Sequence, residues 1–216
     1  SDVHGKNHHL HGCFSECVDN IELLLADGSL IRCSRSDHPE LFHATCGGMG
    51  LTGLIVTVTL RLLRIESAYI QQATFKAANL DEALQLFETH SASTYSVAWI
   101  DCLASGAALG RSLLMVGEHA RDGQLLLPTK RALSVPLDMP AALLNRYSVQ
   151  AFNELYYQRI RKPESKQRVT YESFFYPLDG IQQWNRLYGK QGFVQYQFVI
   201  PKAAGLQGMR ATLERI

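Results

Sequence analysis

The stretch Ile-Glu-Leu-Leu-Leu-Ala-Asp-Gly-Ser-Leu-Ile-Arg-Cys, residues 21–33, decides how the first part of the chain folds. Two short runs of β-forming residues, 21–25 and 29–33, flank an Asp-Gly pair at positions 27 and 28. Such a pair between apolar runs is the strongest short-range signal for a β-hairpin. The sequence therefore fixes the pairing of these two strands locally.

The residues after the hairpin predict a short helix and then a strand. Residues 36–40 offer a capping side chain and an early proline, and the glycines at 47–50 must end the helix. Residues 54–62 form a β-branched run that is typical of a buried strand. Residues 64–68 predict the joint between two domains.

Beyond this joint the pattern becomes mixed α and β. Residues 69–75 predict a strand, and Asn79 can cap a helix whose apolar stripe includes Leu80 and Phe87. The chain as a whole is therefore expected to have an α+β fold. Further strands are predicted at residues 96–101, 112–116, 170–176 and 194–200, helices near 141–161 and 180–188, and an extended connection with three prolines at 123–140.

The composition narrows the classes of partner. Among the 216 residues, 21 Lys and Arg balance 20 Asp and Glu, so net charge gives no case for a nucleic acid or an anionic membrane. Five scattered cysteines, an odd number, are typical of free thiols, and we expect a cytoplasmic protein. No apolar run reaches the roughly 18 residues that span a bilayer. A small molecule is the expected partner.

Four histidines and Lys6 crowd the first segment, residues 4–12. They could bind a metal, although zinc sites usually draw ligands from two separated clusters and no second cluster follows. They could also form a solvated polar loop. A third hypothesis is a cofactor loop, in which the glycine beside His4 lets the main chain approach a flat ring and Lys6 and His8 supply positive charge. The spacing does not choose among the three.

The glycine-dense residues 47–53 allow two interpretations. They can end the preceding helix and make a tight connection, or they can form a backbone cradle for a nucleotide, with Thr52 adding a hydroxyl. The segment is not a dinucleotide-binding fingerprint, because that motif follows a strand and opens a helix.

Two amides and three larger side chains are candidates for a substrate pocket. Gln195 and Gln197 would share one face of the predicted strand at 194–200, where they could orient a hydroxylated substrate or simply form a polar surface. Trp99, Trp184 and Arg186 could add an aromatic wall and a cation, but the tryptophans could equally be core residues.

Five segments carry a family resemblance. They are Ser1-Asp-Val-His-Gly-Lys-Asn-His-His9, Glu40-Leu-Phe-His-Ala-Thr45, Gly47-Gly-Met-Gly-Leu-Thr-Gly-Leu-Ile55, Trp184-Asn-Arg-Leu-Tyr-Gly189 and Gly192-Phe-Val-Gln-Tyr-Gln-Phe-Val-Ile-Pro201. In this order they resemble FAD-linked oxidases of the vanillyl-alcohol-oxidase family, over nearly the whole chain. The first and last segments are the most specific. The resemblance favours a flavin over a metal, and we predict no metal ligands.

The resemblance implies two domains. Residues 1–64 would be the C-terminal portion of a PCMH-type FAD-binding domain, and residues 65–216 an incomplete substrate domain of antiparallel sheet and helices. The residues implied to contact FAD are Ser1, Asp2, Val3, His4 and Ile55. Those implied to face the substrate are Trp99, Trp184 and Arg186, together with Lys6, Gln195 and Gln197 as the catalytic candidates.

The resemblance also implies a reaction, the oxidation of a secondary alcohol of a sugar to a ketone by hydride transfer to the flavin. A lipid-linked pentose is one such substrate, and it would be compatible with peripheral membrane contact. The electron acceptor is not identified. Aldonolactone or alditol oxidation and a non-catalytic binding domain are the alternatives. Because the family's upstream glycine-rich loop and a late lysine segment have no counterpart here, we expect an internal fragment that binds FAD weakly.

Overall fold

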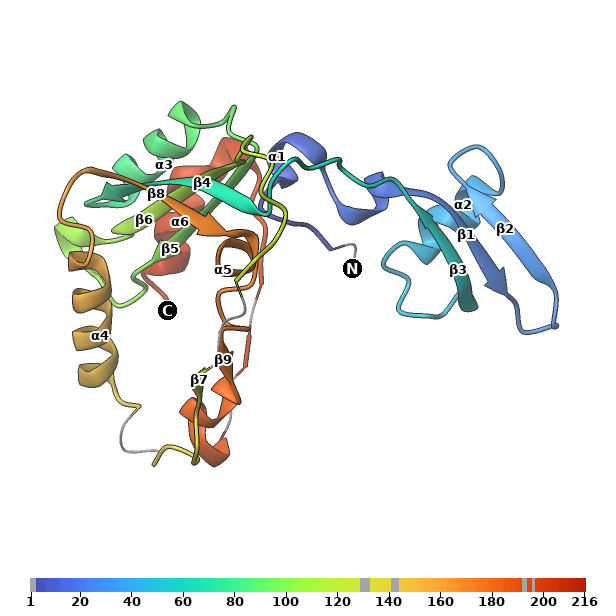
Figure 1. The fold of residues 1–216 in the computed structure, drawn as a ribbon. Coiled ribbons are helices and arrows are strands. Elements are labelled where there is room, and N and C mark those ends of the chain that lie inside the picture. Colours follow the sequence, from blue (N-terminus) through green and yellow to red (C-terminus); the bar gives the residue numbers. More distant parts are fainter. Residues whose placement is uncertain (1–2, 129–132, 141–143, 192–193, 196) are drawn as a thin grey trace. The chain divides into compact units, whose positions relative to one another are not determined.

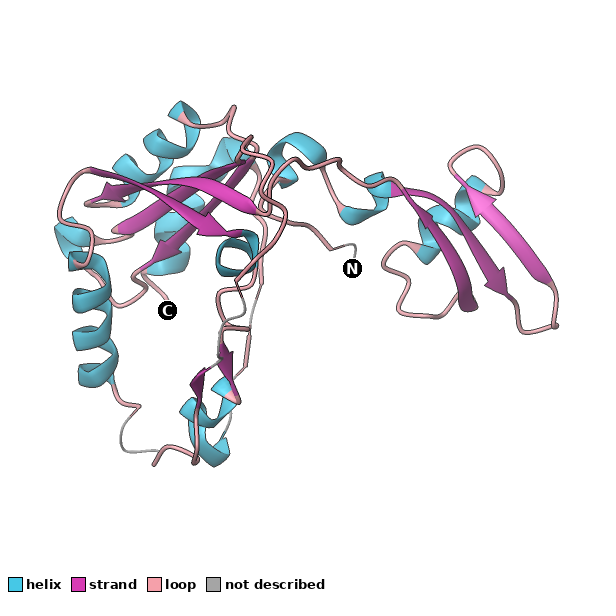
Figure 2. Ribbon diagram, in the orientation of Figure 1, coloured by secondary structure: helices cyan, strands magenta, loops and turns pink. Residues whose placement is uncertain are grey.

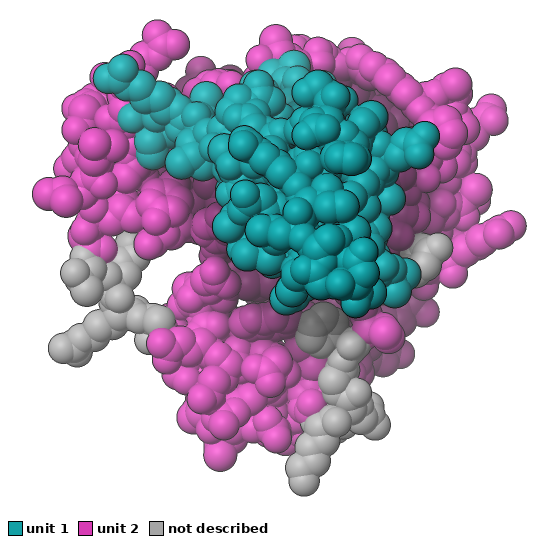
Figure 3. All heavy atoms as spheres, turned by 90° about the vertical axis from the view of Figure 1, so that its right-hand side faces the viewer, with its two compact units in different colours: residues 1–65 teal, residues 66–216 magenta. Residues whose placement is uncertain are grey.

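The computed structural model divides the chain into two compact units, Ser1–Ile65 and Glu66–Ile216, which Figure 3 shows in different colours. Both units combine helices with antiparallel sheets, so the predicted α+β class is confirmed. Ser1 and Asp2, which the resemblance assigns to FAD, lie outside the described residues. The structure describes residues 3–128, 133–140, 144–191, 194–195 and 197–216.

Unit 1 is built on a three-stranded sheet of order β2-β1-β3. Strands β1 (Val18–Leu24) and β2 (Leu30–Ser34) pair antiparallel and form the predicted hairpin, which is thus confirmed. Its turn is stabilised by Asp27, whose carboxylate accepts hydrogen bonds from the Ser29 amide at 2.9 Å and the Ser29 hydroxyl at 2.6 Å. Local sequence alone therefore accounts for this element.

Helix α2 (Pro39–Thr45) covers one side of this sheet and begins at the predicted proline. Its Phe42 is fully buried and packs with Leu23 and Cys33 in the small core of the unit. After the helix, a Cβ on Gly48 would lie 2.1 Å from the Ala44 carbonyl oxygen. Only glycine fits this close approach, so the glycine cluster ends the helix as predicted.

Strand β3 (Leu54–Leu60) forms where a strand was predicted, but the prediction that it is buried is wrong. All seven residues are exposed, with Leu54 at 66% and Val56 at 51%. The strand lies at the edge of the sheet and pairs with β1 (Figure 1). A strand is buried when strands pair with it on both sides and other elements cover its faces. In the described residues of unit 1, β3 pairs with β1 on one side.

Unit 2 is built on a four-stranded antiparallel sheet of order β5-β6-β4-β8 (Figure 2). The predicted strands at 69–75, 96–101 and 112–116 are confirmed as parts of β4, β5 and β6. The central strand β4 pairs on both sides, with β6 and with β8. The four strands are β4 (Tyr69–Ala77), β5 (Tyr95–Ile100), β6 (Ser112–His119) and β8 (Glu164–Thr170).

Helices cover both faces of this sheet. On one face, α3 (Leu80–Thr89) and α6 (Gly205–Leu213) pack around Leu80, Leu213 and Ile100. On the other, Phe174 of α5 (Tyr171–Phe175) packs on Ile70 and Tyr95. Successive residues of a strand point to opposite faces of the sheet. Tyr95 and Ile100 are five positions apart in β5, an odd number, so they belong to different layers. The predicted Asn79 cap of α3 is confirmed, since its side chain accepts a hydrogen bond from the Glu82 amide.

Three predictions for the later chain need correction. Within the predicted strand at 170–176, residues 171–175 instead form helix α5, because Thr170, the last residue of β8, caps it by accepting a hydrogen bond from the Ser173 amide. The described residues 194–195 and 197–200 form no strand. The predicted helix at 180–188 is replaced by β9 (Ile181–Gln182) and the 3₁₀ segment η4 (Trp184–Gln191).

The remaining elements of unit 2 are the helix α4 and several short segments. Helix α4 (Arg146–Gln158) lies within the range predicted to be helical, of which residues 141–143 lie outside the described part. Strand β7 (Leu133–Ser134) pairs in parallel with β9. The short helical turns are η2 (Gly106–Ala108) and η5 (Lys202–Ala204). None of the helices in the described part of the chain has the length and apolarity needed to cross a bilayer.

Candidate functional site

The histidine-rich segment of unit 1 is a loop whose two ends are held together. An isolated antiparallel bridge joins His4 to Cys13, and the Phe14 amide donates a hydrogen bond to the Val3 carbonyl at 2.6 Å. Between these ends the chain makes one turn of helix, α1 (His8–His11). The 3₁₀ turn η1 (Phe14–Cys17) then leads into β1. These contacts therefore anchor Val3 and His4, two of the residues that the resemblance assigns to FAD.

Most side chains of this loop are polar, and the four histidines are exposed. The rings of His4 and His8 meet edge to face with centroids 4.9 Å apart. Lys6 is half-buried, and burial lowers its pKa below the ordinary lysine value because the charged form is poorly solvated there. In the described part of the chain, no three His, Cys, Asp or Glu side chains come together in a way that could hold a metal ion.

Ile55 lies in the same unit but away from this loop. It is 47% exposed and sits near the start of β3. The other end of the strand adjoins η1, since the Arg61 amide donates a hydrogen bond to the Cys17 carbonyl. At the rise of a β-strand, Ile55 and Leu60 are about 16 Å apart. The structure therefore does not gather Val3, His4 and Ile55 into one cluster, and only an elongated ligand could touch all three.

The glycine-dense segment at residues 47–53 makes a tight connection. Gly50 has φ of 78° and Met49 has φ of 57°, both in the left-handed region. The Thr52 hydroxyl hydrogen-bonds to the Thr45 hydroxyl at 2.9 Å, which ties the loop back to α2. The hydroxyl that the cradle hypothesis offered to a nucleotide thus has an internal partner. The geometry favours the interpretation as a helix end and connection.

In unit 2, Trp99 belongs to an aromatic group on the α4 side of the sheet. Its ring lies 4.8 Å from that of Tyr156, centroid to centroid. The Arg159 guanidinium stacks 3.8 Å from the centre of the Tyr156 ring and also donates a hydrogen bond to its hydroxyl at 2.8 Å. These contacts hold the tyrosine in place, so Trp99 is part of a fixed, partly buried aromatic wall.

Trp184 and Arg186 lie in η4. The Trp184 ring meets Tyr188 edge to face at 6.0 Å. The Arg186 guanidinium donates hydrogen bonds to the carbonyls of Val135 at 3.1 Å and Pro136 at 2.7 Å, so it ties the preceding connection to η4. Figure 1 shows η4, next to β7 and β9, apart from β5. The structure therefore does not bring Trp184 and Arg186 together with Trp99.

The two amide candidates are also placed differently from the prediction. Gln195 and Gln197 are exposed and lie in chain without regular structure. The prediction that they share one face of a strand is wrong, because the described residues 194–195 and 197–200 form no strand. Both residues are exposed and so accessible to a ligand.

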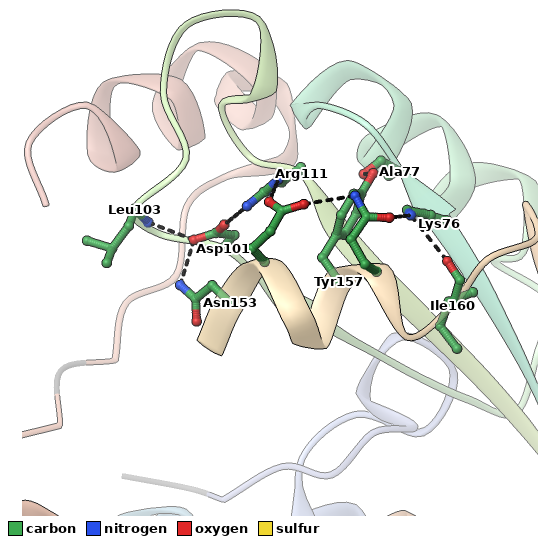
Figure 4. Close-up of polar contacts among 10 residues, drawn as sticks. Lys76, Ala77, Asp101, Leu103, Arg111, Asn153, Tyr157 and Ile160 are labelled. Atoms are coloured by element: carbon green, nitrogen blue, oxygen red, sulfur yellow. Dashed lines mark hydrogen bonds and ion pairs between the residues drawn. The ribbon is translucent and has the colours of Figure 1, made fainter. Parts of the chain in front are cut away.

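The sequence did not predict an extended polar network of unit 2, which is drawn in Figure 4. The Asp101 side chain is only 3% exposed. Its carboxylate accepts hydrogen bonds from Arg111 Nε at 2.9 Å and Nη2 at 2.7 Å, from Asn153 Nδ2 at 2.7 Å and from the Leu103 amide at 3.1 Å. A buried charge with this many partners is well compensated.

The same network continues along α4. Burial opposes the charge of Arg111, but its hydrogen bonds and ion pairs with Asp101 and Glu154 outweigh that effect and raise its pKa. The Tyr157 hydroxyl donates to the Ala77 carbonyl at 3.0 Å, and Lys76 Nζ donates to Gln158 Oε1 at 3.1 Å. Because these groups partner one another, the network fixes α4 to the sheet.

A sequence signal for this network does exist. Ile100 and Ser112 are paired in the antiparallel register of β5 and β6, so residues 101 and 111 must meet just beyond the strand ends. An acidic and a basic residue at those two positions indicate an ion pair. The contribution of Asn153 comes from a distant helix and has no such local signal.

The chain is similar in sequence to known oxidoreductases. This similarity confirms the resemblance to FAD-linked oxidases that the sequence indicated. No protein-family model matches the chain. The chain is 36% identical to decaprenylphosphoryl-beta-D-ribose oxidase of Mycolicibacterium smegmatis, over 94% of this chain and 46% of that enzyme. It is 34% identical to L-gulonolactone oxidase of Bos taurus, over 37% of this chain and 18% of that enzyme.

A third relative has no described activity. The chain is 34% identical to an uncharacterized protein in the mprA 5'region of Streptomyces coelicolor, over 67% of this chain and 41% of that protein. The chain thus spans less than half the length of each of these three relatives.

Proposed function

We propose that this chain is part of an FAD-dependent oxidoreductase that oxidises a secondary alcohol of a sugar to a ketone, with a lipid-linked pentose as the substrate class. The observation that carries the proposal is the similarity to decaprenylphosphoryl-beta-D-ribose oxidase along 94% of the chain. In this proposal, unit 1 supplies part of a PCMH-type FAD-binding domain and unit 2 supplies part of the substrate domain.

The residues of unit 1 fit such a cofactor in their chemistry. Val3 and Ile55 are exposed apolar side chains at 63% and 47%, and they offer surface to a flat ring or to the adenine end of an extended dinucleotide. The exposed His4 beside Gly5 leaves the main chain approachable. The separation of the histidine loop from Ile55 along β3 suits a long ligand better than a compact one.

When bound, FAD supplies a two-electron acceptor for the oxidation of a carbinol. The residues of this chain would then bind and orient the sugar. Lys6, whose pKa burial lowers, can hold a positive charge or a proton near an oxygen that becomes negative. The Trp99 wall gives a sugar ring an apolar surface, and the amides of Gln195 and Gln197 can pair with hydroxyl groups.

The experiment that tests this function is the anaerobic reduction of the full-length polypeptide by candidate substrates. A prenylphosphoryl ribose, free ribose and L-gulonolactone are mixed separately with the protein, and loss of the visible flavin absorbance is followed. Reduction by the prenylphosphoryl ribose is the expected result. The second candidate function is that of an aldonolactone oxidase, which the similarity to the bovine enzyme supports. Reduction by L-gulonolactone alone would favour this candidate. Failure of all three would contradict the proposal.

The amide assignment has its own test. Because a lost hydrogen bond to a bound hydroxyl typically costs about 1–3 kcal/mol, Gln195→Ala or Gln197→Ala should lower kcat/KM by roughly ten- to a hundred-fold. Gln85→Ala, at an exposed position of α3, is the matched control and should leave kcat/KM unchanged. Equal kcat/KM in all three variants would remove both glutamines from the site.

A further inference from the structure

The outward side of α4 carries an apolar stripe. Tyr147 and Leu155 are 81% and 74% exposed, and they lie two turns apart on one side of the helix. Phe152, 59% exposed, widens the stripe. The opposite side of the helix faces the sheet, where Asn153 and Tyr157 are buried. Since the polar network around Asp101 fixes that inner side, the helix presents the stripe in a constant orientation.

The same segment is basic, although the whole chain is close to neutral. Residues 144–170 contain six Lys and Arg side chains and two glutamates, whereas the whole chain has a net charge of +1. Arg161 and Lys162, just after α4, are exposed. Among the ion pairs of the described residues, none involves Arg161 or Lys162. Their charge is therefore available to an anionic partner.

An apolar helix face with cations close by is typical of helices that lie in the plane of a membrane surface. The aliphatic and aromatic side chains enter the boundary of the acyl chains, while lysine and arginine reach the lipid phosphates. We infer that α4, together with residues 159–162, rests on an anionic lipid bilayer. This inference rests on the proposed function. An enzyme that oxidises a lipid-linked substrate has to meet that substrate at a membrane surface.

A comparison with strand β3 shows why the cations near α4 indicate a lipid surface as its partner. It is also apolar and exposed, but its seven residues are Leu, Ile, Val and Thr, and none is charged. A surface of that kind suits packing against another protein element. A nucleic acid or an acidic protein would engage the cations near α4 but would leave the stripe exposed. The combination of stripe and cations on α4 fits a lipid surface better than either.

The test is cosedimentation of the full-length polypeptide with vesicles of phosphatidylcholine alone and of equal parts phosphatidylcholine and phosphatidylglycerol. Binding is expected to the mixed vesicles. Removing cations with Arg161→Ala and Lys162→Ala should weaken that binding roughly five-fold for each charge. Tyr147→Glu with Leu155→Glu should weaken it by more than ten-fold. The matched controls are Leu126→Glu, 85% exposed in a loop of the same unit, and Arg121→Ala, exposed in that unit.

Several results would overturn the inference. The first is that the α4 variants and the controls bind the mixed vesicles equally well, and the second is that the parent protein does not bind these vesicles. The third is that the α4 substitutions change self-association of the protein without vesicles, which would make this face an interface between two copies. Thermal unfolding of each variant shows whether it has folded. Flavin content is measured in the same samples, so that protein with flavin and no vesicle binding defeats this inference alone. Vesicle binding through α4 without flavin defeats the proposed function alone.

Discussion

Strands β3 and β4 are both rich in β-forming residues, but they have opposite environments. Every residue of β3 is exposed, whereas β4 contains the fully buried Ile70 and Ala77. The difference is in their neighbours: β4 lies between β6 and β8 with helices on both faces, and β3 is an edge strand. A β-forming run therefore predicts a strand, but its burial depends on partners that are distant in the sequence.

The largest expected effect is in the buried network that supports unit 2. Asp101→Ala would leave Arg111 and Asn153 without their shared acceptor, and breaking a buried pair typically costs about 3–5 kcal/mol of unfolding free energy. Urea unfolding followed by circular dichroism measures this loss. Glu88→Ala removes an exposed ion pair with Lys202 and should cost at most about 1 kcal/mol. Similar losses in the two variants would show that the network contributes no special stability.

The second prediction compares leucines in the two units directly. Leu113 in β6 is fully buried and Leu54 in β3 is 66% exposed. Leu113→Ala should cost about 2–5 kcal/mol, because it leaves a cavity. Leu54→Ala in this chain should change the unfolding free energy by about 0.5 kcal/mol or less. If Leu54→Ala were as costly as Leu113→Ala, β3 would not be an exposed edge strand.

A smaller effect is expected from helix caps. The Asn79 side chain caps α3, whereas Asn7, at the same position before α1, makes no side-chain cap hydrogen bond. Asn79→Ala should therefore lower the unfolding free energy by about 1 kcal/mol, and Asn7→Ala should lower it much less. Thermal melts of the two variants beside the parent protein check this difference. A larger loss from Asn7→Ala would contradict it.

The smallest effect concerns Lys6 and depends on pH. Its pKa in the folded chain lies below the ordinary lysine value of 10.5, so between these two values the unfolded chain binds more protons. Stability should therefore rise with pH across that window, and below it the cost of burying the charge is fully present. Lys6→Met should abolish the rise. Urea unfolding at neutral pH and near pH 10 tests this, and an unchanged pH dependence in Lys6→Met would exclude the effect.

Elements with local signals were predictable from the sequence. The Asp27-Gly28 turn and the Asn79 cap are each determined by residues within a few positions, and both occur as predicted. Residues 170–176 contain aromatic residues that favour a strand, but 171–175 form α5, in which Phe174 is buried under the sheet. That outcome depends on tertiary packing, which sequence periodicity does not contain.

The candidate site was less predictable than the fold. The sequence picked out Lys6, His4 and Trp99, and the structure places them in ordered surroundings on their respective units. The expected strand that would align Gln195 with Gln197 is absent from the described residues of that segment. The Asp101 network was missed because Asp101, Arg111 and Asn153 come from three separate segments.

The central claim is tested most directly by the visible absorption spectrum of the full-length polypeptide, recorded beside that of this 216-residue chain, before and after addition of FAD. We predict bound-flavin bands in the full-length polypeptide, and weak or no uptake by the chain alone. If the full-length polypeptide is folded but shows no flavin bands even with excess FAD, the oxidoreductase proposal is contradicted and a non-catalytic binding domain becomes the better account.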